Sequence, residues 1–421
     1  MEYIDIFSRS VDSNPARVPA MSLDVDEDSW KSYKNRGSPR PQTPLAQAEI
    51  NKQIEILLQN KIIRKSNAVH YSQVVVVPKP NGKFRLCVDY KKLNDCTVHN
   101  GWPLPHIKQL LQIIGSVRPK YFAVMDMTSG YHQIAMDPSS ISMTAFICFM
   151  GVYEWLRVPF GLKGAPGFFQ QQLATVVLSG IIHIICELYL DDCIVFAPNE
   201  TEYLTRLRDV FDRFRNYNIK LNPDKCRFGL EEVEYLGHVI NSKGVHFSPE
   251  RLAKILSINR PRIPKDMKIF LGTVNYLRDH IKDFSIITAP LYAMINPYDK
   301  KSKKELNWTP ELIQSYEHLL GLVQNCPTIY FMDLESPVFL HTDACDVGIG
   351  AYLFQVKDGK EYPVSFISKA LSGSQLNWST YDKEAYGIYY AIFKLQHLIR
   401  DIKFTVRTDH KNLVHIVDCC H

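Results

Sequence analysis

The chain has 421 residues, 46% of them hydrophobic and 22% charged, which is an ordinary composition for a globular protein with well-formed cores. At about 150 residues per domain, this length suggests two to four domains. The formal net charge of +5 is compatible with a nucleic-acid partner and does not demand one. The ten cysteines form no C-x-x-C pair, so the pattern indicates neither a zinc site nor a disulfide framework.

The sequence carries no sign of a targeting or membrane-spanning segment. Residues 1–5 lack the basic head and the apolar run of a signal peptide. The longest apolar stretch, residues 174–190, contains Gly180, His183 and Glu187 and is too short and too polar to cross a bilayer. We therefore expect a soluble cytoplasmic protein with reduced thiols and no membrane partner.

Residues 1–42 show no hydrophobic periodicity and end in a stretch rich in glycine and proline, which predicts a loosely ordered leader. Thr43 then has the character of a helix N-cap, and a proline follows it at the first helical position. Apolar residues recur at helical spacing from Ile50 to Leu58, which predicts an amphipathic helix that ends near Asn60.

A β-hairpin is expected next, because the apolar residues 72–78 and the return strand 83–90 flank a Pro-Asn-Gly turn. Lys79 and Arg85 lie near the tip of this hairpin. They form either a solvated basic edge that deters strand pairing or a clamp on a triphosphate, in which Arg forks onto phosphate oxygens and Lys acts as a point charge. This stretch alone favours the solvated edge.

The chain is organised around residues 182–197, two apolar runs that flank Asp191 and Asp192 and predict a hairpin with two carboxylates at its tip. Adjacent Asp residues in a turn are usually only turn formers. A third carboxylate, Asp126, ends the apolar strand 121–126. Three like charges at strand ends favour a divalent cation, and hard Mg²⁺ prefers carboxylate and phosphate oxygens. This pattern is what a two-metal phosphoryl transfer needs.

Two further features lie between these acids. Tyr131 follows Asp126 where the chain leaves the strand, so its ring is expected either beside the carboxylates or in the core with its hydroxyl bound to the backbone. Residues 158–170 read as a bend rich in glycine and proline that leads into a helix, and small residues there would permit close approach of a base or a template backbone. Ordinary turns have the same composition.

Together these segments resemble the reverse transcriptase of gypsy-type long-terminal-repeat retrotransposons, over roughly residues 45–421. The matching stretches are 74–94, 122–134, 144–170, 189–196, 221–228 and 235–237. The resemblance implies that Asp126, Asp191 and Asp192 hold two Mg²⁺ ions. It also implies that Lys79 and Arg85 contact the triphosphate, that Tyr131 excludes a ribose 2′-hydroxyl, and that Phe160 and Gly161 form the floor of the nucleotide pocket. Gly164 departs from the usual Asn-Ala-Pro beside that pocket.

The resemblance divides the chain into fingers and palm over residues 43–247 and a helical thumb or connection over residues 248–330. A Ser-Pro-Glu start signal at residues 248–250 and an apolar stripe from Phe270 to Leu277 support helices in the second part.

Residues 331–421 change to a pattern of strands. The runs 338–343 and 404–409 end in Asp343 and Asp409, and Glu384 lies near the start of the helix between them. Each acid alone is an ordinary surface charge. In this order they resemble a ribonuclease H domain, which would bind two Mg²⁺ ions and cut RNA within an RNA–DNA hybrid.

The family's domain continues well past the match to Asp409, so this one is expected to be C-terminally incomplete. The helix from Thr380 can cover one face of the sheet, whereas no later segment covers the other. Uncovered apolar surface costs about 25 cal/mol per Å², so a few hundred Å² of it removes several kcal/mol, which rivals the stability of a small domain. We therefore expect residues 336–421 to be marginally folded and hybrid cleavage to be weak or absent.

The overall prediction is an α+β protein, a right-hand polymerase with fingers, palm and thumb followed by a partial ribonuclease H-like α/β domain. Its function would be RNA-directed DNA polymerisation of a retrotransposon, with an RNA template, a DNA primer, an RNA–DNA hybrid and deoxynucleoside triphosphates as partners. The alternatives are a decayed or domesticated nucleic-acid-binding remnant, or a regulatory partner of a full-length copy. Oligomeric state, presence in virus-like particles and presence in the nucleus stay open.

Overall fold

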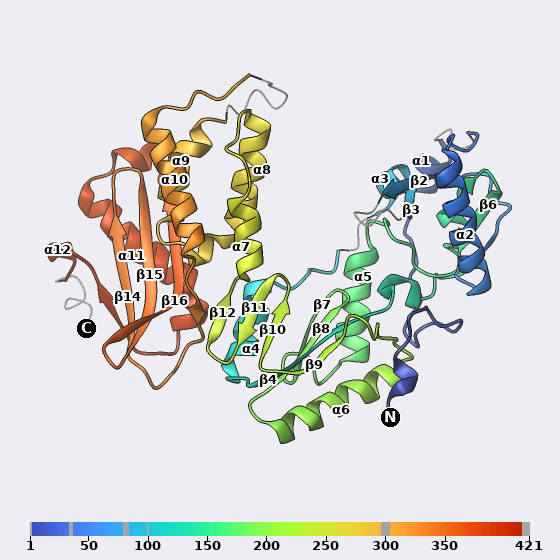
Figure 1. Ribbon diagram of the computed structural model, residues 1–421, viewed down its shortest axis with the longest axis horizontal. Coiled ribbons are helices and arrows are strands. Elements are labelled where there is room, and N and C mark those ends of the chain that lie inside the picture. The colour runs from blue at the N-terminus through green and yellow to red at the C-terminus, as the bar shows by residue number, and fades with distance from the viewer. Residues whose placement is uncertain (1, 33–36, 79–83, 99–100, 296–303, 415–421) are drawn as a thin grey trace. The chain divides into compact units, whose positions relative to one another are not determined.

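The structure is a computed structural model that describes residues 2–32, 37–78, 84–98, 101–295 and 304–414 (Figure 1). The chain separates into two compact units, Met1–Leu236 and Gly237–His421. No helix in the described ranges is long and apolar enough to span a membrane.

The first unit combines two sheets with surrounding helices. Its elements are η1(Ile4–Ile6), α1(Glu27–Ser32), α2(Pro44–Gln59), β1(Ile63–Lys65), β2(Ser72–Pro78), β3(Phe84–Asp89), α3(Lys91–Cys96), α4(Ile107–Ser116), β4(Tyr121–Asp126), η2(Gly130–Gln133), η3(Ile141–Thr144), β5(Phe146–Cys148), β6(Gly151–Trp155), α5(Ala165–Gln172), η4(Leu173–Val177), β7(Cys186–Tyr189), β8(Asp192–Ala197), α6(Glu200–Asn216), β9(Arg227–Leu230) and β10(Glu232–Tyr235).

The second unit begins with two short strands, continues with helices and then forms a sheet. Its elements are β11(His238–Asn241), β12(Gly244–His246), α7(Pro249–Leu256), α8(Pro264–Val274), η5(Asn275–His280), α9(Phe284–Ala293), α10(Pro310–Gln324), β13(Ile329–Tyr330), β14(Val338–Ala344), β15(Gly348–Lys357), β16(Lys360–Ala370), η6(Gly373–Asn377), α11(Thr380–Ile399), β17(Phe404–Arg407) and α12(Lys411–Val414).

The N-terminal segment differs from the loosely ordered leader expected for residues 1–42. Its apolar side chains are irregularly spaced, yet Ile6, Val11, Met21 and Trp30 are buried in the main core of the first unit. Backbone hydrogen bonds join the segment to residues far along the chain, for example from Leu221 N to Ile6 O at 2.8 Å. Irregular spacing hides such a segment from periodicity arguments, because long-range contacts rather than a regular element bury it.

One sheet of the first unit has the strand order β1-β6-β5-β2-β3, and we call it the fingers sheet. The expected hairpin is confirmed by the antiparallel pairing of β2 with β3, from Gln73 opposite Asp89 to Pro78 opposite Phe84. The expected helix is also confirmed, because the Thr43 side chain accepts a hydrogen bond from Ala46 N at the start of α2.

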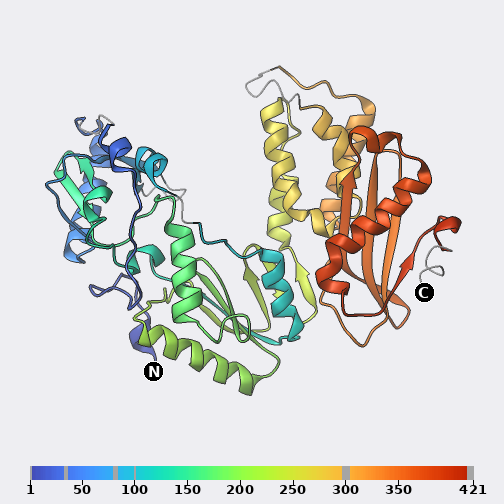
Figure 2. The same ribbon diagram turned by 180° about the vertical axis from the view of Figure 1, so that it is seen from behind.

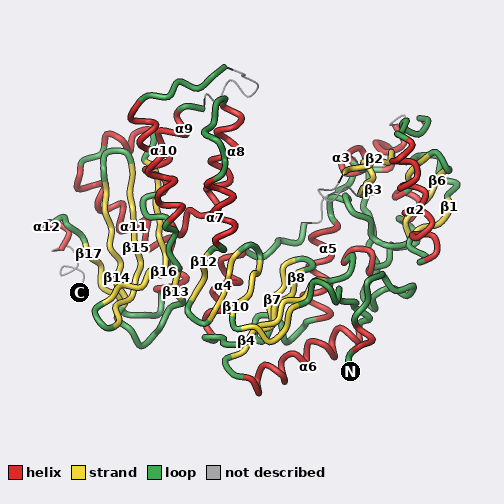
Figure 3. Tube along the Cα trace, in the orientation of Figure 1, coloured by secondary structure: helices red, strands yellow, loops and turns green. Residues whose placement is uncertain are grey.

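The palm sheet has the strand order β7-β8-β4-β9, and α6 packs against β4 and β8 (Figure 3). Its central strands β4 and β8 are largely buried, with Phe122 and Phe196 both 0% exposed. Strands β7 and β8 are joined by a tight turn. This turn lies at the same end of the sheet as the last residue of β4, because that residue, Asp126, pairs with Asp192 at the start of β8. This arrangement positions the carboxylates described below.

The helices of the second unit enclose their own core. Met267, Phe270 and Leu271 of α8 pack with Leu291 of α9 and Leu319 of α10, and all five are fully buried. The apolar stripe predicted from Phe270 to Leu277 therefore faces this core.

The last sheet has the strand order β16-β15-β14-β17, with β14 and β17 parallel. Helix α11, red in Figure 2, packs on one face, where Ala391 and Leu395 contact Leu340 and Leu353. Helix α9 packs on the other face, against β15 and β16. The expectation that nothing covers this second face is thus wrong, because α9, which precedes the sheet in the chain, covers part of it.

Candidate active sites

The first acid cluster lies at the turn of the palm hairpin. In the antiparallel ladder of β4 and β8, Asp126 stands directly opposite Asp192, and Met127 N donates a hydrogen bond to Asp191 O at 3.1 Å. Directly opposed residues send their side chains to the same face of a sheet. The structure therefore brings together the three carboxylates that the sequence singled out.

The turn itself is fixed by a buried glutamine. Leu190 has a left-handed backbone with φ of 55°, which is unfavourable for a branched apolar residue. The side chain of Gln170 in α5 is 2% exposed; it donates to Leu188 O at 3.1 Å and accepts from Leu190 N at 2.6 Å. These two bonds hold the turn in the conformation that presents Asp191.

A lysine that the sequence reasoning did not single out completes the cluster. Lys225 Nζ lies 2.9 and 3.1 Å from the two carboxylate oxygens of Asp126. Only its place in the matching stretch 221–228 pointed to it, since the two residues are 99 positions apart.

Electrostatics at this cluster favours a cation. Burial raises the pKa of Asp192 to about 6, and the charges of Asp191 and Asp126 add to the effect, while Lys225 opposes it. Burial also raises the pKa of Asp191. Crowded carboxylates with raised pKa values are a donor set that suits a hard divalent cation. Asp126, Asp191 and Asp192 would hold it.

The loop that follows β4 approaches the hairpin closely. A Cβ added to Gly130 would lie 2.8 Å from Phe169 Cζ and 3.4 Å from Asp191 Cβ, so a side chain at this position would displace one of them. This close approach brings Tyr131 next to the acids.

Tyr131 belongs to an aromatic group at this place. Its ring centroid lies 5.1 Å from that of Phe160 and 5.2 Å from that of Phe169, both in edge-on geometry. The side chain is half-buried, and burial followed by the charge of Asp191 raises its pKa. Phe160 is 48% exposed, and Gly161 O accepts a hydrogen bond from Asn94 Nδ2 at 2.9 Å. The structure thus places Tyr131 beside the carboxylates and packs Phe160 against its ring, while Gly161 follows Phe160 and contacts Asn94.

Of the two basic residues predicted to act in the fingers hairpin, the structure describes only the backbone of Arg85. Lys79 lies outside the described residues. The backbone of Arg85 pairs with Val77 in the β2–β3 ladder, and its side chain is not described. Their role therefore stays a prediction.

Hydrogen bonds of buried side chains fix the segment that follows Asp126. Gln133, 3% exposed, donates from Nε2 to Thr128 O and Lys220 O, both at 2.9 Å, and accepts from Lys220 N at 2.7 Å. The Thr128 hydroxyl donates to Ser8 O at 2.7 Å. One buried amide and the N-terminal segment therefore fix the chain just after Asp126 and join it to the segment around Lys220.

The second acid cluster lies at the end of β14 in the second unit. Asp343, Glu384 and Asp409 each offer a carboxylate oxygen within 4.8 Å of the others, as the sequence predicted. Glu384 comes from α11, is 3% exposed, and accepts from Ala344 N at 3.1 Å through Oε1. Its other oxygen, Oε2, is buried and has no hydrogen-bond partner among the residues that the structure describes.

An orphaned carboxylate oxygen is costly unless a cation or a proton satisfies it. Burial raises the pKa of Glu384, and the charges of Asp409 and Asp343 add to this effect. Three converging carboxylates, one of them with an unsatisfied buried oxygen, are a donor set that fits a divalent cation.

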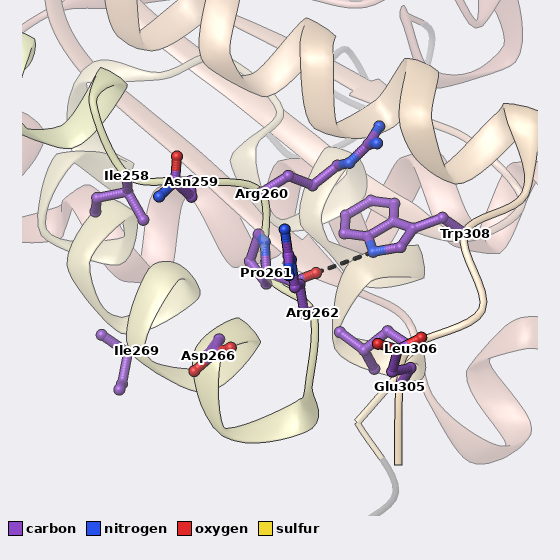
Figure 4. Close-up of a pocket in the computed structure, with 10 residues that line it drawn as sticks. All are labelled: Ile258, Asn259, Arg260, Pro261, Arg262, Asp266, Ile269, Glu305, Leu306 and Trp308. Carbon is purple, nitrogen blue, oxygen red and sulfur yellow. Dashed lines mark hydrogen bonds between the residues drawn. The ribbon is translucent and has the colours of Figure 1, made fainter. Parts of the chain in front are cut away.

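A cleft elsewhere in the second unit contains none of these acids. It has a volume of about 910 Å³ and lies between the loop that precedes α8 and the segment before α10 (Figure 4). Trp308 Nε1 donates to Pro261 O at 3.0 Å, and the guanidinium of Arg260 lies 5.6 Å from the Trp308 ring centroid. The arginines that line it are exposed, and nothing in the described structure indicates an occupant.

Two family matches cover these two sites. Residues 77–240 match the family described as reverse transcriptase (RNA-dependent DNA polymerase), and residues 333–420 match the RNase H-like domain found in reverse transcriptase. The fold and the two acid clusters define a polymerase of the right-hand class followed by a ribonuclease H-like unit.

Similar proteins show which family within this class the chain resembles. The chain is 35% identical over 380 residues to the retrovirus-related Pol polyprotein from transposon 297 of Drosophila melanogaster, covering 88% of the chain and 35% of the relative. It is 34% identical to that from transposon 412 of the same organism, with 99% and 33% covered. It is 33% identical to the Tf2-3 polyprotein of Schizosaccharomyces pombe, with 98% and 31% covered. The chain thus spans about a third of the length of these relatives.

Solved structures support the same fold. A foamy viral protease-reverse transcriptase in complex with dsDNA has a TM-score of 0.83 at 22% identity, covering 99% of this chain and 85% of that one. Another, in complex with an RNA/DNA hybrid, has a TM-score of 0.77 at 23% identity, with 98% and 55% covered. The chain belongs to the reverse transcriptases with an RNase H-like domain that occur in Pol polyproteins of long-terminal-repeat retrotransposons.

Proposed function

We propose that the first unit is an RNA-directed DNA polymerase, which extends a DNA primer on an RNA template with deoxynucleoside triphosphates. The observation that carries this proposal is the pairing of Asp126 with Asp192 at the end of β4, with Asp191 on the adjoining turn. Nucleic-acid partners are supported by the foamy viral relatives of this fold, whose structures contain dsDNA and an RNA/DNA hybrid.

The three aspartates would hold Mg²⁺, two ions in the arrangement that phosphoryl transfer uses. When bound, the ions would lower the pKa of the primer 3′-hydroxyl and stabilise the charge that builds on the α-phosphate. The protein contributes position: Gln170 fixes the turn that carries Asp191, and Gln133 fixes the chain around Asp126. Such preorganisation is what keeps ligands within the narrow tolerance that a reaction needs.

Tyr131 would select deoxynucleotides, because a rigid ring beside the metal-binding acids collides with a ribose 2′-hydroxyl. Its half-buried position between Phe160 and Phe169 combines the two alternatives left open by the sequence: the ring packs with the core, and it still stands at the site. Phe160 and Gly161 would form the floor beneath the nucleotide. Lys79 and Arg85 would contact its triphosphate.

For the second unit, we propose cleavage of RNA within an RNA–DNA hybrid. This proposal rests on the convergence of Asp343, Glu384 and Asp409 and on the unsatisfied oxygen of Glu384. These residues would hold two Mg²⁺ ions. Intact acids at both clusters favour an enzyme over a decayed or domesticated remnant.

Each activity has its own test. Primer extension on an RNA template by the parent chain and by Asp191→Asn tests the polymerase. Cleavage of a hybrid with labelled RNA by the parent and by Asp343→Asn tests the nuclease. The sequence predicts weak or absent cleavage. Robust cleavage that disappears in Asp343→Asn would overturn that prediction and support the nuclease.

A further inference from the structure

One carboxylate next to the second acid cluster comes from the helical part of the second unit. Asp283 precedes α9 and has a left-handed backbone, with φ of 54°. It occupies the N-cap position, yet its side chain makes no capping hydrogen bond to the helix. The carboxylate is therefore directed to something other than the start of its own helix.

The start of α9 is anchored to the sheet. Ser285 N donates to Ser368 Oγ at 2.8 Å, and Ser285 Oγ donates to Ser368 O at 2.9 Å. A Cβ added to Gly350 would lie 2.1 Å from Asp283 Oδ1, so the carboxylate rests directly on the α-carbon of this glycine. Any side chain at residue 350 would expel Asp283.

The strand register then places Asp283 beside Asp343. Gly350 stands opposite Ser368 on one side and opposite Asp343 on the other, and the three residues form a row across β16, β15 and β14. Directly opposed residues face the same side of the sheet, so the Asp343 side chain leaves the sheet on the face that α9 covers. Burial raises the pKa of Asp283, and the negative charge of Asp343 adds to this effect.

We propose that Asp283 lies in the outer coordination sphere of the second acid cluster, beside Asp343, and helps the cluster to bind divalent cations. The inference rests on the proposed function of that cluster. The Ser285–Ser368 bonds hold this carboxylate in place next to Asp343, where it adds negative charge and orients water in the outer coordination sphere. Glu384 Oε2 is buried and has no hydrogen-bond partner among the described residues, which indicates independently that the cluster binds a cation.

The test is Mn²⁺ binding by the full chain, measured from the electron paramagnetic resonance signal of free Mn²⁺. All variants are made in an Asp191→Asn, Asp192→Asn background, which weakens binding at the palm. Asp283→Asn keeps the size of the side chain and tolerates the left-handed backbone. We expect it to weaken Mn²⁺ binding at the second cluster by about 10-fold or more, the usual effect of losing an outer-sphere partner.

Controls separate this inference from the function on which it rests. Asp266→Asn, on the exposed surface of α8, is expected to leave binding unchanged. If Asp343→Asn weakens binding but Asp283→Asn does not, the role of Asp283 is refuted and the cluster stands. If neither change affects binding, the proposed metal site itself is refuted. Should Asp283→Asn not fold, Asp283→Gly removes the carboxylate at a residue type suited to this backbone, and the same outcomes apply.

Discussion

Lys225 forms a two-oxygen ion pair with Asp126, with its ammonium nitrogen 2.9 and 3.1 Å from the carboxylate oxygens. The lysine side chain is 61% exposed, whereas that of Asp126 is 17% exposed. The hydrogen bond to Asp126 and the charges of Asp191 and Asp192 raise the pKa of Lys225 despite its partial burial. A cation of this chain thus lies where the three proposed metal ligands converge, and a divalent ion bound there would have to compete with it for Asp126.

We predict that Lys225→Gln binds Mg²⁺ more tightly than the parent chain. Removing the ammonium abolishes the competing ion pair, which at this exposure is worth about 0.2–1 kcal/mol, or up to roughly fivefold in affinity. The measurement is the Mg²⁺ concentration at half-maximal primer extension. Lys120→Gln, an exposed palm lysine, serves as the control. Weaker Mg²⁺ binding in Lys225→Gln than in the parent would show that Lys225 assists the metal instead of competing with it.

The pKa of Asp192 predicts the pH dependence of metal binding. Because this carboxyl has a pKa of about 6 instead of 3.8, it is largely neutral at pH 5 and ionised at pH 7. A cation that needs the ionised form must release a proton below pH 6, so its affinity falls as the pH drops, by at most about tenfold per unit. The same shift means that the ionised group destabilises the metal-free fold, and this penalty grows as the pH rises from 3.8 to about 6.

Mn²⁺ titrations between pH 5 and pH 8 check this prediction. The titrations use an Asp343→Asn background, which weakens binding at the second cluster, and the control adds Asp192→Asn, which should bind weakly and with less dependence on pH. An affinity of the Asp343→Asn chain that stays constant from pH 5 to pH 7 would contradict a raised pKa at Asp192.

Substitution of Gln170 should affect both stability and activity. Gln170→Met retains the volume but leaves Leu188 O and Leu190 N without their partners, and each buried unsatisfied group costs about 1–3 kcal/mol. The turn that carries Asp191 should loosen, so that extension slows more than primer binding weakens. Urea unfolding and separate values of kcat and KM measure the two effects. Gln170→Glu keeps the acceptor for Leu190 N and should lose less; equal losses in both variants would argue against this bracing role.

Tyr131→Ala should raise the incorporation of ribonucleotides relative to deoxyribonucleotides, because the ring that would meet the 2′-hydroxyl is gone. Tyr131→Phe keeps the ring and should keep the parent ratio. Competition assays with paired nucleotides measure this ratio. The same ratio in Tyr131→Ala as in the parent would return Tyr131 to a purely structural role between Phe160 and Phe169.

The sequence predicted best those features that depend on neighbouring residues. An apolar strand that ends in an acid is visible in a short window, and for this reason Asp126, Asp343 and Asp409 were identified before their partners were known. Lys225 was missed because its pairing with Asp126 spans 99 residues. Contacts of this kind are set by the packing of the whole unit, on which local spacing carries no information.

The same reasoning explains the errors at the two ends. The N-terminal segment carries no regular pattern, and the contacts of residues such as Ile6 with Leu221 give it order. The final sheet was expected to lack cover on one face because only later segments were considered. Helix α9, placed earlier in the chain, lies on that face, where Gly348 and Gly350 leave room for Ile286 and Asp283.

The central claim is tested most directly by extension of a labelled DNA primer on an RNA template, with Mg²⁺ and deoxynucleoside triphosphates, by the purified chain and by Asp191→Asn. Loss of a carboxylate that binds the catalytic ions should lower the rate by several orders of magnitude, while circular dichroism shows an unchanged fold. The exposed palm variant Lys120→Gln should extend at the parent rate. Extension by Asp191→Asn as fast as that of the parent chain would contradict the assignment of the palm carboxylates as the polymerase site.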